Sequence, residues 1–354
     1  MTSVKCLGIL TYHNADNLGA VLQAYALQRV LEQDSDISAE IIDYRCAAIE
    51  ATKYVRKDGR AASGIRTLPR AVYYWIKRRG FQKFRRKYLK CSGQMYDLKT
   101  IASSNHVYDA FITGSDQVWN PKCSGCDDTY LLDFVSDGRK KYSYAASIGS
   151  YRFHEHTANR CRDMLKSFDG ISVREASARE ELSRIGIENV QICPDPVLLL
   201  TEEDWKAIMP GRLCKQKYVL VYQILPDSRI TKMAEAYAKK HHCKVIHNKK
   251  SLEFILHNSP AYFLSWIYYA DCVFTNSFHG TAFSLLFEKP LCADVKMADG
   301  RVNDRVQELL EAAGAEKCAL CDNQADVFAA HSKAALSDMR KNGQQYLRKL
   351  CGEI

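Results

Sequence analysis

The chain has 354 residues, of which 47% are hydrophobic and 26% are charged, so we expect a globular protein of about two domains. A disordered or fibrous chain is excluded. The formal net charge is +9, yet residues 51–90 alone hold 14 Lys and Arg against one acidic residue, Asp58. One basic segment on a slightly acidic protein argues against a general nucleic-acid coat. It favours a local anionic partner, such as a membrane face, a diphosphate or an anionic glycan.

Short apolar segments alternate with helical ones along the chain. Val21, Leu22, Tyr25 and Val30 recur at helical spacing and predict a helix over Ala20–Leu31. The other expected elements are strands at Val4–Leu10, Ile41–Tyr44, Val107–Thr113, Lys141–Ala146, Ile171–Val173, Val190–Ile192, Lys217–Tyr222, Lys244–Ile246, Cys272–Thr275 and Leu291–Ala293, with helices at 229–241, 260–269 and 280–287. Alternation of this kind builds parallel sheets covered by helices, so the predicted fold class is α/β with two Rossmann-like lobes.

The lobe boundary is expected in the turn-rich stretch 194–216. It gives an N-terminal lobe over 1–205 and a C-terminal lobe over 206–330. The remaining segment is 331–354. A last helix is expected near 324–350, and it could pack back on the first lobe. Ligands of open parallel sheets bind at the carboxyl ends of the strands, which in a two-lobed chain would face a shared cleft.

The sequence predicts a cytoplasmic protein. The apolar part of the first ten residues is too short for a secretory signal, and polar residues interrupt the most apolar stretch, 254–287. The 14 cysteines are then expected to be reduced thiols. Two C-x-x-C pairs, Cys123/Cys126 and Cys318/Cys321, could form a zinc site, but they lie 192 residues apart, and we expect no metal.

The loop over 11–20, between the first strand and the first helix, is the first candidate site. Gly19 allows close backbone approach at the helix start, where N–H groups favour an anion or sugar oxygens. Asn14, Asp16 and Asn17 are short polar groups suited to hydroxyls. The alternative is that Asp16 or Asn17 caps the helix, and both roles can coexist.

The loop over 114–121 follows a convincing strand. Asp116 at the carboxyl end of that strand is a candidate general base. The alternative, given equal weight, is that Asp116 holds the loop through backbone hydrogen bonds.

Two further loops carry groups suited to an anion. Arg174 ends a short strand, and its planar guanidinium suits a carboxylate or phosphate, unless it pairs with Glu175 or Glu180. His279 lies at a strand–turn–helix junction, where the N–H groups near Gly280 and Thr281 could hold phosphate. Arg305 could add positive charge. Together, the four loops indicate a two-lobed transferase with an anionic donor. They do not identify that donor.

The chain resembles the polysaccharide pyruvyl transferase family. The matching segments, which keep the family's order over most of the chain, are Gly8–Asn14 with Asn17–Gln23, Tyr108–Phe111 through Trp119–Pro121, Ser143–Ser147, Ile171–Glu175, Asp195–Leu199 and Thr275–Gly280. Gly-Ser-Asp-Gln-Val-Trp-Asn and Ser-Phe-His-Gly are the specific strings. The resemblance implies a fold like that of the two-lobed GT-B glycosyltransferases, and transfer of pyruvate from phosphoenolpyruvate (PEP) onto two hydroxyls of a sugar as a cyclic ketal. It also implies a role in bacterial surface polysaccharide, such as exopolysaccharide or capsule.

The resemblance assigns the donor to the second lobe and the acceptor to the first. The residues expected to bind PEP are Arg174, Asn276, Ser277, Phe278, His279, Gly280 and Arg305. Those expected to bind the acceptor are His13, Asn14, Asn17, Gly19, Ser115 and Asp116. His279 is the candidate general acid, and Asp116 or Asp16 the candidate base. No cofactor is required, because protonation creates the electrophile.

The basic segment has two interpretations. Leu68, Val72, Ile76, Gly80, Phe84 and Tyr88 recur every four residues, with Tyr73, Trp75 and Phe81 nearby and Lys77–Arg79 and Arg85–Lys87 on other faces. This suits an amphipathic helix over residues 66–90 on an anionic membrane, where the family's lipid-linked acceptors would be found and the protein would be peripheral. The alternative, slightly favoured, is a core-packed helix with a solvated basic face.

The sequence leaves three competing functions. A GT-B glycosyltransferase with a nucleotide-sugar donor would share the fold and the anionic donor. Nucleic-acid binding through residues 51–90 lacks any recognised module, so no nucleic acid is expected. A redox role for the C-x-x-C pairs is weaker still, since neither pair opens a clear helix after a strand.

Overall fold

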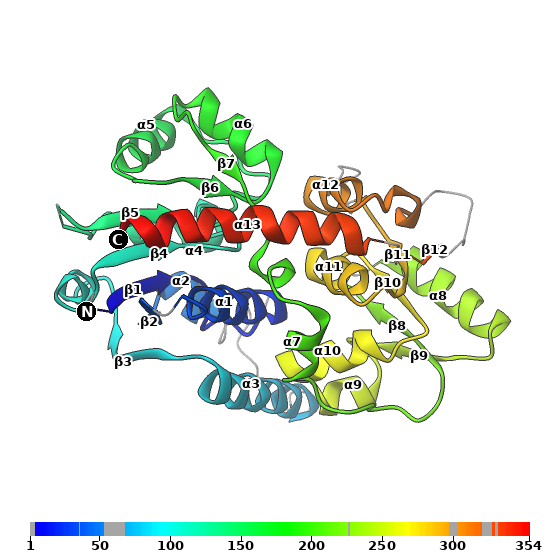
Figure 1. Ribbon diagram of the computed structural model, residues 1–354. Helices are drawn as coiled ribbons and strands as arrows, with labels where there is room; N and C mark the ends of the chain where they lie inside the picture. The colour runs from blue at the N-terminus through cyan, green and yellow to red at the C-terminus, as the bar shows by residue number, and fades with distance from the viewer. Residues whose placement is uncertain are drawn as a thin grey trace. The chain divides into compact units, whose positions relative to one another are not determined.

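The computed structural model describes residues 4–34, 36–52, 68–136, 138–225, 227–296, 303–320, 328–329 and 332–354. They form two compact units (Figure 1). Unit 1 takes the described residues up to 52, together with Arg85–Leu199 and Met339–Ile354. Unit 2 takes residues 68–84 and Leu200–Asp338.

Unit 1 contains a parallel five-stranded sheet in the order β3-β2-β1-β4-β5. The strands are β1 Lys5–Leu10, β2 Ile37–Tyr44, β3 Cys91–Tyr96, β4 Ala110–Thr113 and β5 Lys140–Ser143. A short parallel pair, β6 Ser172–Val173 and β7 Gln191–Ile192, continues beside β5 through the bridge from Tyr142 to Gly170. This is the strand order of a Rossmann sheet.

The helices of unit 1 bury the sheet. Their bounds are α1 Leu18–Leu31, α2 Ala47–Thr52, α4 Pro121–Ser124, α5 Glu155–Leu165 and α6 Ala176–Arg184, with 3-10 turns η2 Ile101–His106, η3 Asp128–Leu131 and η4 Pro196–Leu198. Almost every residue of α1 is buried, which explains its apolar sequence. The last helix, α13 Lys333–Glu353 (Figure 1), belongs to unit 1 from Met339 on. Its Tyr346 hydroxyl donates to the carbonyl of Ser143 at 2.9 Å.

Unit 2 contains a second five-stranded sheet in the order β12-β11-β10-β8-β9. The strands are β8 Tyr218–Tyr222, β9 Lys244–His247, β10 Cys272–Thr275, β11 Pro290–Ala293 and β12 Phe328–Ala329. The first four are parallel, and β12 pairs antiparallel with β11 at the edge. Taken in chain order, these strands have the 2-1-3-4-5 order of a flavodoxin-like sheet. Both sheets confirm the predicted α/β class with parallel sheets.

The helices of unit 2 follow its strands in turn. Their bounds are α7 Glu202–Lys206, α8 Ser228–Lys240, α9 Leu252–Leu256, α10 Pro260–Tyr268, α11 Phe278–Leu286 and α12 Asp304–Ala312, with a 3-10 turn η5 Glu316–Cys318. Among the described residues, no helix combines the length and the apolar character needed to cross a bilayer.

Two stretches that the sequence analysis gave to the first lobe belong to unit 2. Residues 200–205 do so because Trp205 is fully buried with its ring 5.0 Å from that of Phe283. The helix α3 Leu68–Tyr88 does so as far as Phe84. There Asn258 donates from its side chain to the Tyr73 hydroxyl at 3.4 Å, and its carbonyl lies where a Cβ on Gly80 would collide.

Candidate active site

Each sheet changes direction of winding at one place, and ligands of such sheets bind outside the carboxyl ends of the strands at that switch point. In unit 1 the switch lies between β1 and β4, which pair in parallel up to Leu10 and Thr113. The loops that come after these strands are the two over 11–20 and 114–121. In unit 2 the switch lies between β8 and β10, so the loops after Tyr222 and Thr275 are brought together.

The loop after β1 is held by its own polar side chains. Asn17 caps α1 by accepting from the N–H groups of Gly19 and Ala20 at 2.9 and 3.3 Å. The capping alternative is therefore confirmed, and these N–H groups are occupied rather than open to a sugar oxygen. Asp16 accepts from Arg85 at 2.9 Å.

His13 and Asn14 face inward from the same loop. Asn14 donates to Glu50, and His13 Nε2 lies 3.0 Å from the carboxylate of Asp43. Burial alone would raise the pKa of Asp43, but hydrogen bonds from His13 and Arg45 lower it to about 2. This carboxylate is thus an ionised anchor for the loop, and the His13 side chain, expected to bind the acceptor, is buried against it.

The loop after β4 has a constrained backbone. Gly114 has φ +120°, and a Cβ there would collide with the carbonyl of Tyr144, so only glycine fits. Asp116 and Ala145, in neighbouring loops, are non-glycine residues with φ of 69° and 46°. Left-handed backbone at such residues costs about 1–3 kcal/mol each and gathers at functional sites.

Asp116 stabilises this loop through both its side chain and its backbone. Its carboxylate accepts from the N–H of Gln117 at 2.8 Å, and its carbonyl accepts from the N–H groups of Val118 and Ser147 at 2.8 and 3.0 Å. The half-buried side chain therefore has the structural role left open by the sequence. The base role requires the same carboxylate and stays a prediction.

Gln23 joins the two loops of unit 1 and was missed as a site residue. Its side chain is fully buried, donates to Thr11 Oγ1 at 2.7 Å and accepts from the N–H of Ser115 at 3.0 Å. Ser115 itself is buried and donates to the carbonyl of Ala145 at 2.8 Å. An amide within the apolar run Leu18–Leu27 was the available signal.

Arg174 is enclosed by carboxylates. Its side chain is 3% exposed and lies 3.2 Å from Glu175 and 2.7 Å from Asp195. Burial opposes the charge, but Glu175 and Asp195 raise the pKa of Arg174 above its ordinary value. Glu175 also accepts from Ser147, and Asp195 from Ser115. The ion-pair alternative is confirmed for Glu175, and donor binding by Arg174 stays a prediction.

A cavity of about 180 Å³ opens beside the loop after β4. Trp119 and Phe153 form apolar walls, while Asp127, Asp128 and Arg160 supply polar groups. Arg160 pairs with Asp128, and the Tyr44 hydroxyl donates to Asp127 at 2.6 Å. Aromatic walls with carboxylates and a guanidinium are groups that suit a sugar ring and its hydroxyls.

In unit 2, His279 is the second residue of α11, directly after β10. Ser277 caps this helix by accepting from the N–H of Gly280 at 3.3 Å, and its carbonyl accepts from the N–H of Thr281 at 2.9 Å. The N–H groups of Gly280 and Thr281 are therefore taken by Ser277 and do not face a phosphate. His279 is half-buried, and its ring packs edge-on against buried Phe278 at 5.2 Å.

Asn276 ties the loop after β10 to the loop after β8. It accepts from the N–H of Ile224 at 2.9 Å and donates to the carbonyl of Leu225 at 2.9 Å. Gly280 permits the close packing of α11 on the end of β10, because a Cβ there would lie 2.5 Å from Thr275 Oγ1. Asn276 therefore builds the switch point of unit 2.

Arg229, at the start of α8, is a second residue that the sequence analysis missed. It donates to both carboxylate oxygens of Asp294 at 2.7 Å, and Asp294, directly after β11, is buried. Burial raises the pKa of Asp294, and the hydrogen bond from Arg229 offsets this only in part. The Arg229 side chain is still 34% exposed, so a fixed guanidinium lies at this edge of the sheet.

Further cations lie around the same edge. Lys249 and Lys250 follow β9, Lys296 follows Asp294, and Arg305 is in the first turn of α12, which packs on α11. Among the described residues, the carboxylates of this edge are Asp227, Asp294 and Asp304, the neighbour of Arg305. Within the described part of this edge cations outnumber carboxylates, so it favours an anion more than the carboxylate-rich surroundings of Arg174 do.

A family model for polysaccharide pyruvyl transferase matches residues 17–293, most of the chain. The chain belongs to the polysaccharide pyruvyl transferase family. This confirms the resemblance and identifies the chain as a pyruvyl transferase of polysaccharide biosynthesis. The matched region contains the switch point of unit 2 and, in unit 1, the loop after β4, whereas β1 and residues 11–16 precede it.

Solved structures similar to this pyruvyl transferase are distant. UDP-GlcNAc 2-epimerase from Neisseria meningitidis bound to UDP-GlcNAc has 11% identity and a TM-score of 0.47, covering 97% of this chain and 100% of that one. Anabaena Alr3699/HepE in complex with UDP-glucose has 8% identity and a TM-score of 0.49, covering 99% and 100%. A search of curated proteins gave no significant match. The fold assignment rests on the strand order, and these structures add no argument about the substrate.

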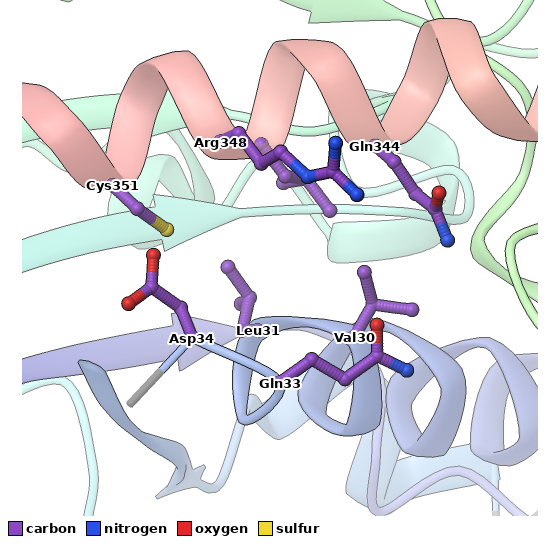
Figure 2. A pocket seen from close by; sticks show the side chains of 8 residues that line it. Val30, Leu31, Gln33, Asp34, Gln344, Arg348 and Cys351 are labelled. Atoms are coloured by element: carbon purple, nitrogen blue, oxygen red, sulfur yellow. The ribbon is translucent and has the colours of Figure 1, made fainter. Parts of the chain in front are cut away.

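A larger cavity, of about 360 Å³, lies elsewhere in unit 1, between α1 and α13 (Figure 2). Arg348, Gln344 and Cys351 face Asp34 and Gln33 across it. It opens at the end of α1, near the amino ends of the strands, and so is apart from the switch point. Burial raises the pKa of Cys351 to about 12, with a further contribution from Asp34, which disfavours the nucleophilic thiolate form.

No group of three or more His, Cys, Asp or Glu in the described part of the chain could hold a metal ion. Of the C-x-x-C cysteines, Cys123 is half-buried, Cys126 is exposed and Cys318 is buried. Cys321 lies outside the described residues.

Proposed function

We propose that the protein transfers pyruvate from PEP to two hydroxyls of a sugar, forming a cyclic ketal and inorganic phosphate. The observation that carries this proposal is the carboxyl edge of unit 2, where the start of α11 with His279 and the guanidinium fixed by Asp294 flank the switch point. PEP has a carboxylate and a phosphate, and these are the groups that a guanidinium and an imidazole bind best.

Unit 2 is proposed to bind the donor. Arg229 would contact one anionic group of PEP, because Asp294 holds its guanidinium in place before the ligand arrives. His279 would contact the phosphate and donate a proton. Ser277, Phe278, Asn276 and Gly280 would set the position of His279, and Arg305 would add to the positive field.

Unit 1 is proposed to bind the acceptor. Of the two candidate bases, Asp116 is preferred, because the Asp16 carboxylate is bonded to Arg85. His13, Asn14, Asn17, Gly19 and Ser115 would keep the loops around Asp116 in place through the contacts described above. The cavity walled by Trp119 and Phe153 would hold a neighbouring part of the sugar.

The proposed reaction balances without a metal or redox partner. His279 gives a proton to the methylene carbon of PEP, and positive charge develops at C2. One acceptor oxygen bonds to C2 as its proton passes to Asp116, and the C2–O bond to phosphate breaks. The second acceptor oxygen then bonds to C2 and loses its proton. The two acceptor hydroxyls release two protons in total. One of them restores the proton that His279 gave to the methylene carbon, and the other leaves with inorganic phosphate.

The acceptor is proposed to be a lipid-linked oligosaccharide of a bacterial surface polysaccharide, modified at the cytoplasmic face of the membrane. The basic helix α3, which belongs to unit 2 as far as Phe84, supports this assignment.

The test is acceptor-dependent release of phosphate from PEP. The purified chain is incubated with PEP, a panel of nucleotide-sugars and a panel of simple hexosides and oligosaccharides, and products are analysed by mass spectrometry. We expect one phosphate per sugar that gains one pyruvate ketal. A sugar that gains a glycosyl group from a nucleotide-sugar, with PEP unused, would contradict the proposal.

A further inference from the structure

The helix α3 carries charge of one sign. It contains eight Lys and Arg and no acidic residue in Leu68–Tyr88. The part that belongs to unit 2 packs through one side, where Phe81 and Phe84 are buried and Gly80 meets the carbonyl of Asn258. These contacts fix which face of α3 points away from unit 2.

That outer face consists of Val72, Trp75, Arg79 and Lys83. Their spacing of three and four residues places them in one stripe of the helix, opposite Phe81 and Phe84. Val72 is 47% exposed and Trp75 is 60% exposed, and Arg79 and Lys83 are exposed as well. Large apolar side chains exposed in this way commonly mark an interaction surface.

Apolar and charged residues occupy different ends of the outer face. The apolar residues Val72 and Trp75 lie toward the start of α3, and the cations Arg79 and Lys83 lie toward its end. The Arg79 guanidinium lies 5.3 Å from the centre of the Trp75 ring. Tryptophan with neighbouring arginine and lysine is the set of side chains that settles at the boundary between lipid headgroups and acyl chains.

We propose that the outer face of α3 docks on a bilayer that contains anionic phospholipid. Charge complementarity selects this partner, because Arg79 and Lys83 are exposed on a helix without any acidic residue, and such a face is drawn to a negative surface. The exposed Val72 and Trp75 then enter the headgroup region. A nucleic acid would use the cations without needing these two apolar residues. The proposal deepens the proposed function, since a lipid-linked acceptor is found at this surface, but it is tested separately.

The experiment is flotation of the full chain with vesicles of phosphatidylcholine, with and without phosphatidylglycerol. The wild-type chain should float with the anionic vesicles alone, and added salt should reduce its recovery. Arg79→Ala/Lys83→Ala should weaken binding roughly 25-fold, from about fivefold for each charge. Val72→Ser/Trp75→Ser should also weaken it.

Two matched controls accompany these variants. Lys239→Ala/Lys240→Ala removes two exposed charges from α8 of the same unit, and Leu98→Ser removes an exposed leucine from unit 1. Both should float like the wild type. Equal recovery on neutral and anionic vesicles, an unchanged Val72→Ser/Trp75→Ser variant, or an equal loss in the Lys239/Lys240 control would overturn the proposal.

The result is separable from the fate of the proposed function. Stabilisation of the chain by PEP, measured by thermal unfolding, should be the same in all four variants. If the chain floats with anionic vesicles but PEP does not stabilise it, the membrane proposal stands and the assignment of PEP as the donor is refuted. If PEP stabilises the chain but the chain does not float, PEP stands as the donor and the membrane proposal is refuted.

Discussion

Arg229 is predicted to supply the fixed guanidinium for the donor, and removing it should weaken PEP binding. A hydrogen bond to a charged group contributes about 1.5–3 kcal/mol, so Arg229→Ala should raise the Kd for PEP about 10- to 150-fold. The same change leaves the Asp294 carboxylate buried without its partner. Breaking a buried pair costs about 3–5 kcal/mol of stability, and the exposed part of Arg229 places the expected loss at the lower end.

Variants of Asp294 separate binding from stability. Asp294→Asn keeps Arg229 but loosens it, and Arg229→Ala/Asp294→Asn removes both charges and so avoids a buried unpaired carboxylate. PEP affinity is measured by calorimetric titration on variants shown to be folded by circular dichroism. The double variant should bind PEP about 10- to 150-fold more weakly than Asp294→Asn. Equal affinity of these two variants would refute the assignment of Arg229.

The same geometry gives three further predictions. His279→Ala should lower kcat by about 10²–10⁴ with the fold intact, whereas near-normal turnover would remove His279 as the proton donor. Burial, with smaller contributions from Lys250 and Lys249, lowers the pKa of His247 to about 4. Because only the unfolded chain then gains this proton between about pH 6.5 and 4, stability should be full above pH 6.5 and fall by about 3 kcal/mol toward pH 4. His247→Asn should reduce the pH dependence of the free energy of unfolding, measured by chemical denaturation. An unchanged pH dependence would contradict the role given to His247. Gln23→Leu leaves the Ser115 N–H without its acceptor, so unfolding should be easier by about 1–3 kcal/mol, while Gln33→Leu at the surface should have little effect.

The strands that the sequence predicted best are those buried on both faces. β10 was predicted with its observed bounds, Cys272–Thr275, because all four residues are buried and apolar or β-branched. β3 was missed because Cys91–Tyr96 lies at the edge of its sheet, with Gln94 and Met95 exposed, so no apolar alternation marks it. Its pairing with β2 includes a 2.9 Å hydrogen bond from the Asp43 N–H to Ser92, a contact that no local pattern reveals.

The stripe predicted on α3 does not form one face. Residues four apart advance 40° beyond a full turn, so the series from Val72 to Phe84 winds around the helix. Val72 accordingly ends exposed and Phe84 buried. The core-packing interpretation thus holds for the side with Phe81 and Phe84, and the membrane interpretation stays a prediction for the exposed side.

The candidate loops could be found in the sequence, but their partners could not. Loops after strands are visible as polar turns, whereas strand order decides which of them meet, and that order depends on long-range pairing. Arg229 was missed for this reason, since Asp294 lies 65 residues away. His13 likewise meets Asp43 across 30 residues.

The most direct test of the central claim is thermal unfolding of the wild-type chain with PEP, compared with pyruvate, phosphate and a panel of nucleotide-sugars. A ligand that binds the folded chain at about 100 times its Kd stabilises it by about 2.7 kcal/mol. We predict that PEP raises the Tm and that the increase is lost in His279→Ala and in Arg229→Ala/Asp294→Asn. An increase with nucleotide-sugars alone, and none with PEP, would contradict pyruvyl transfer from PEP.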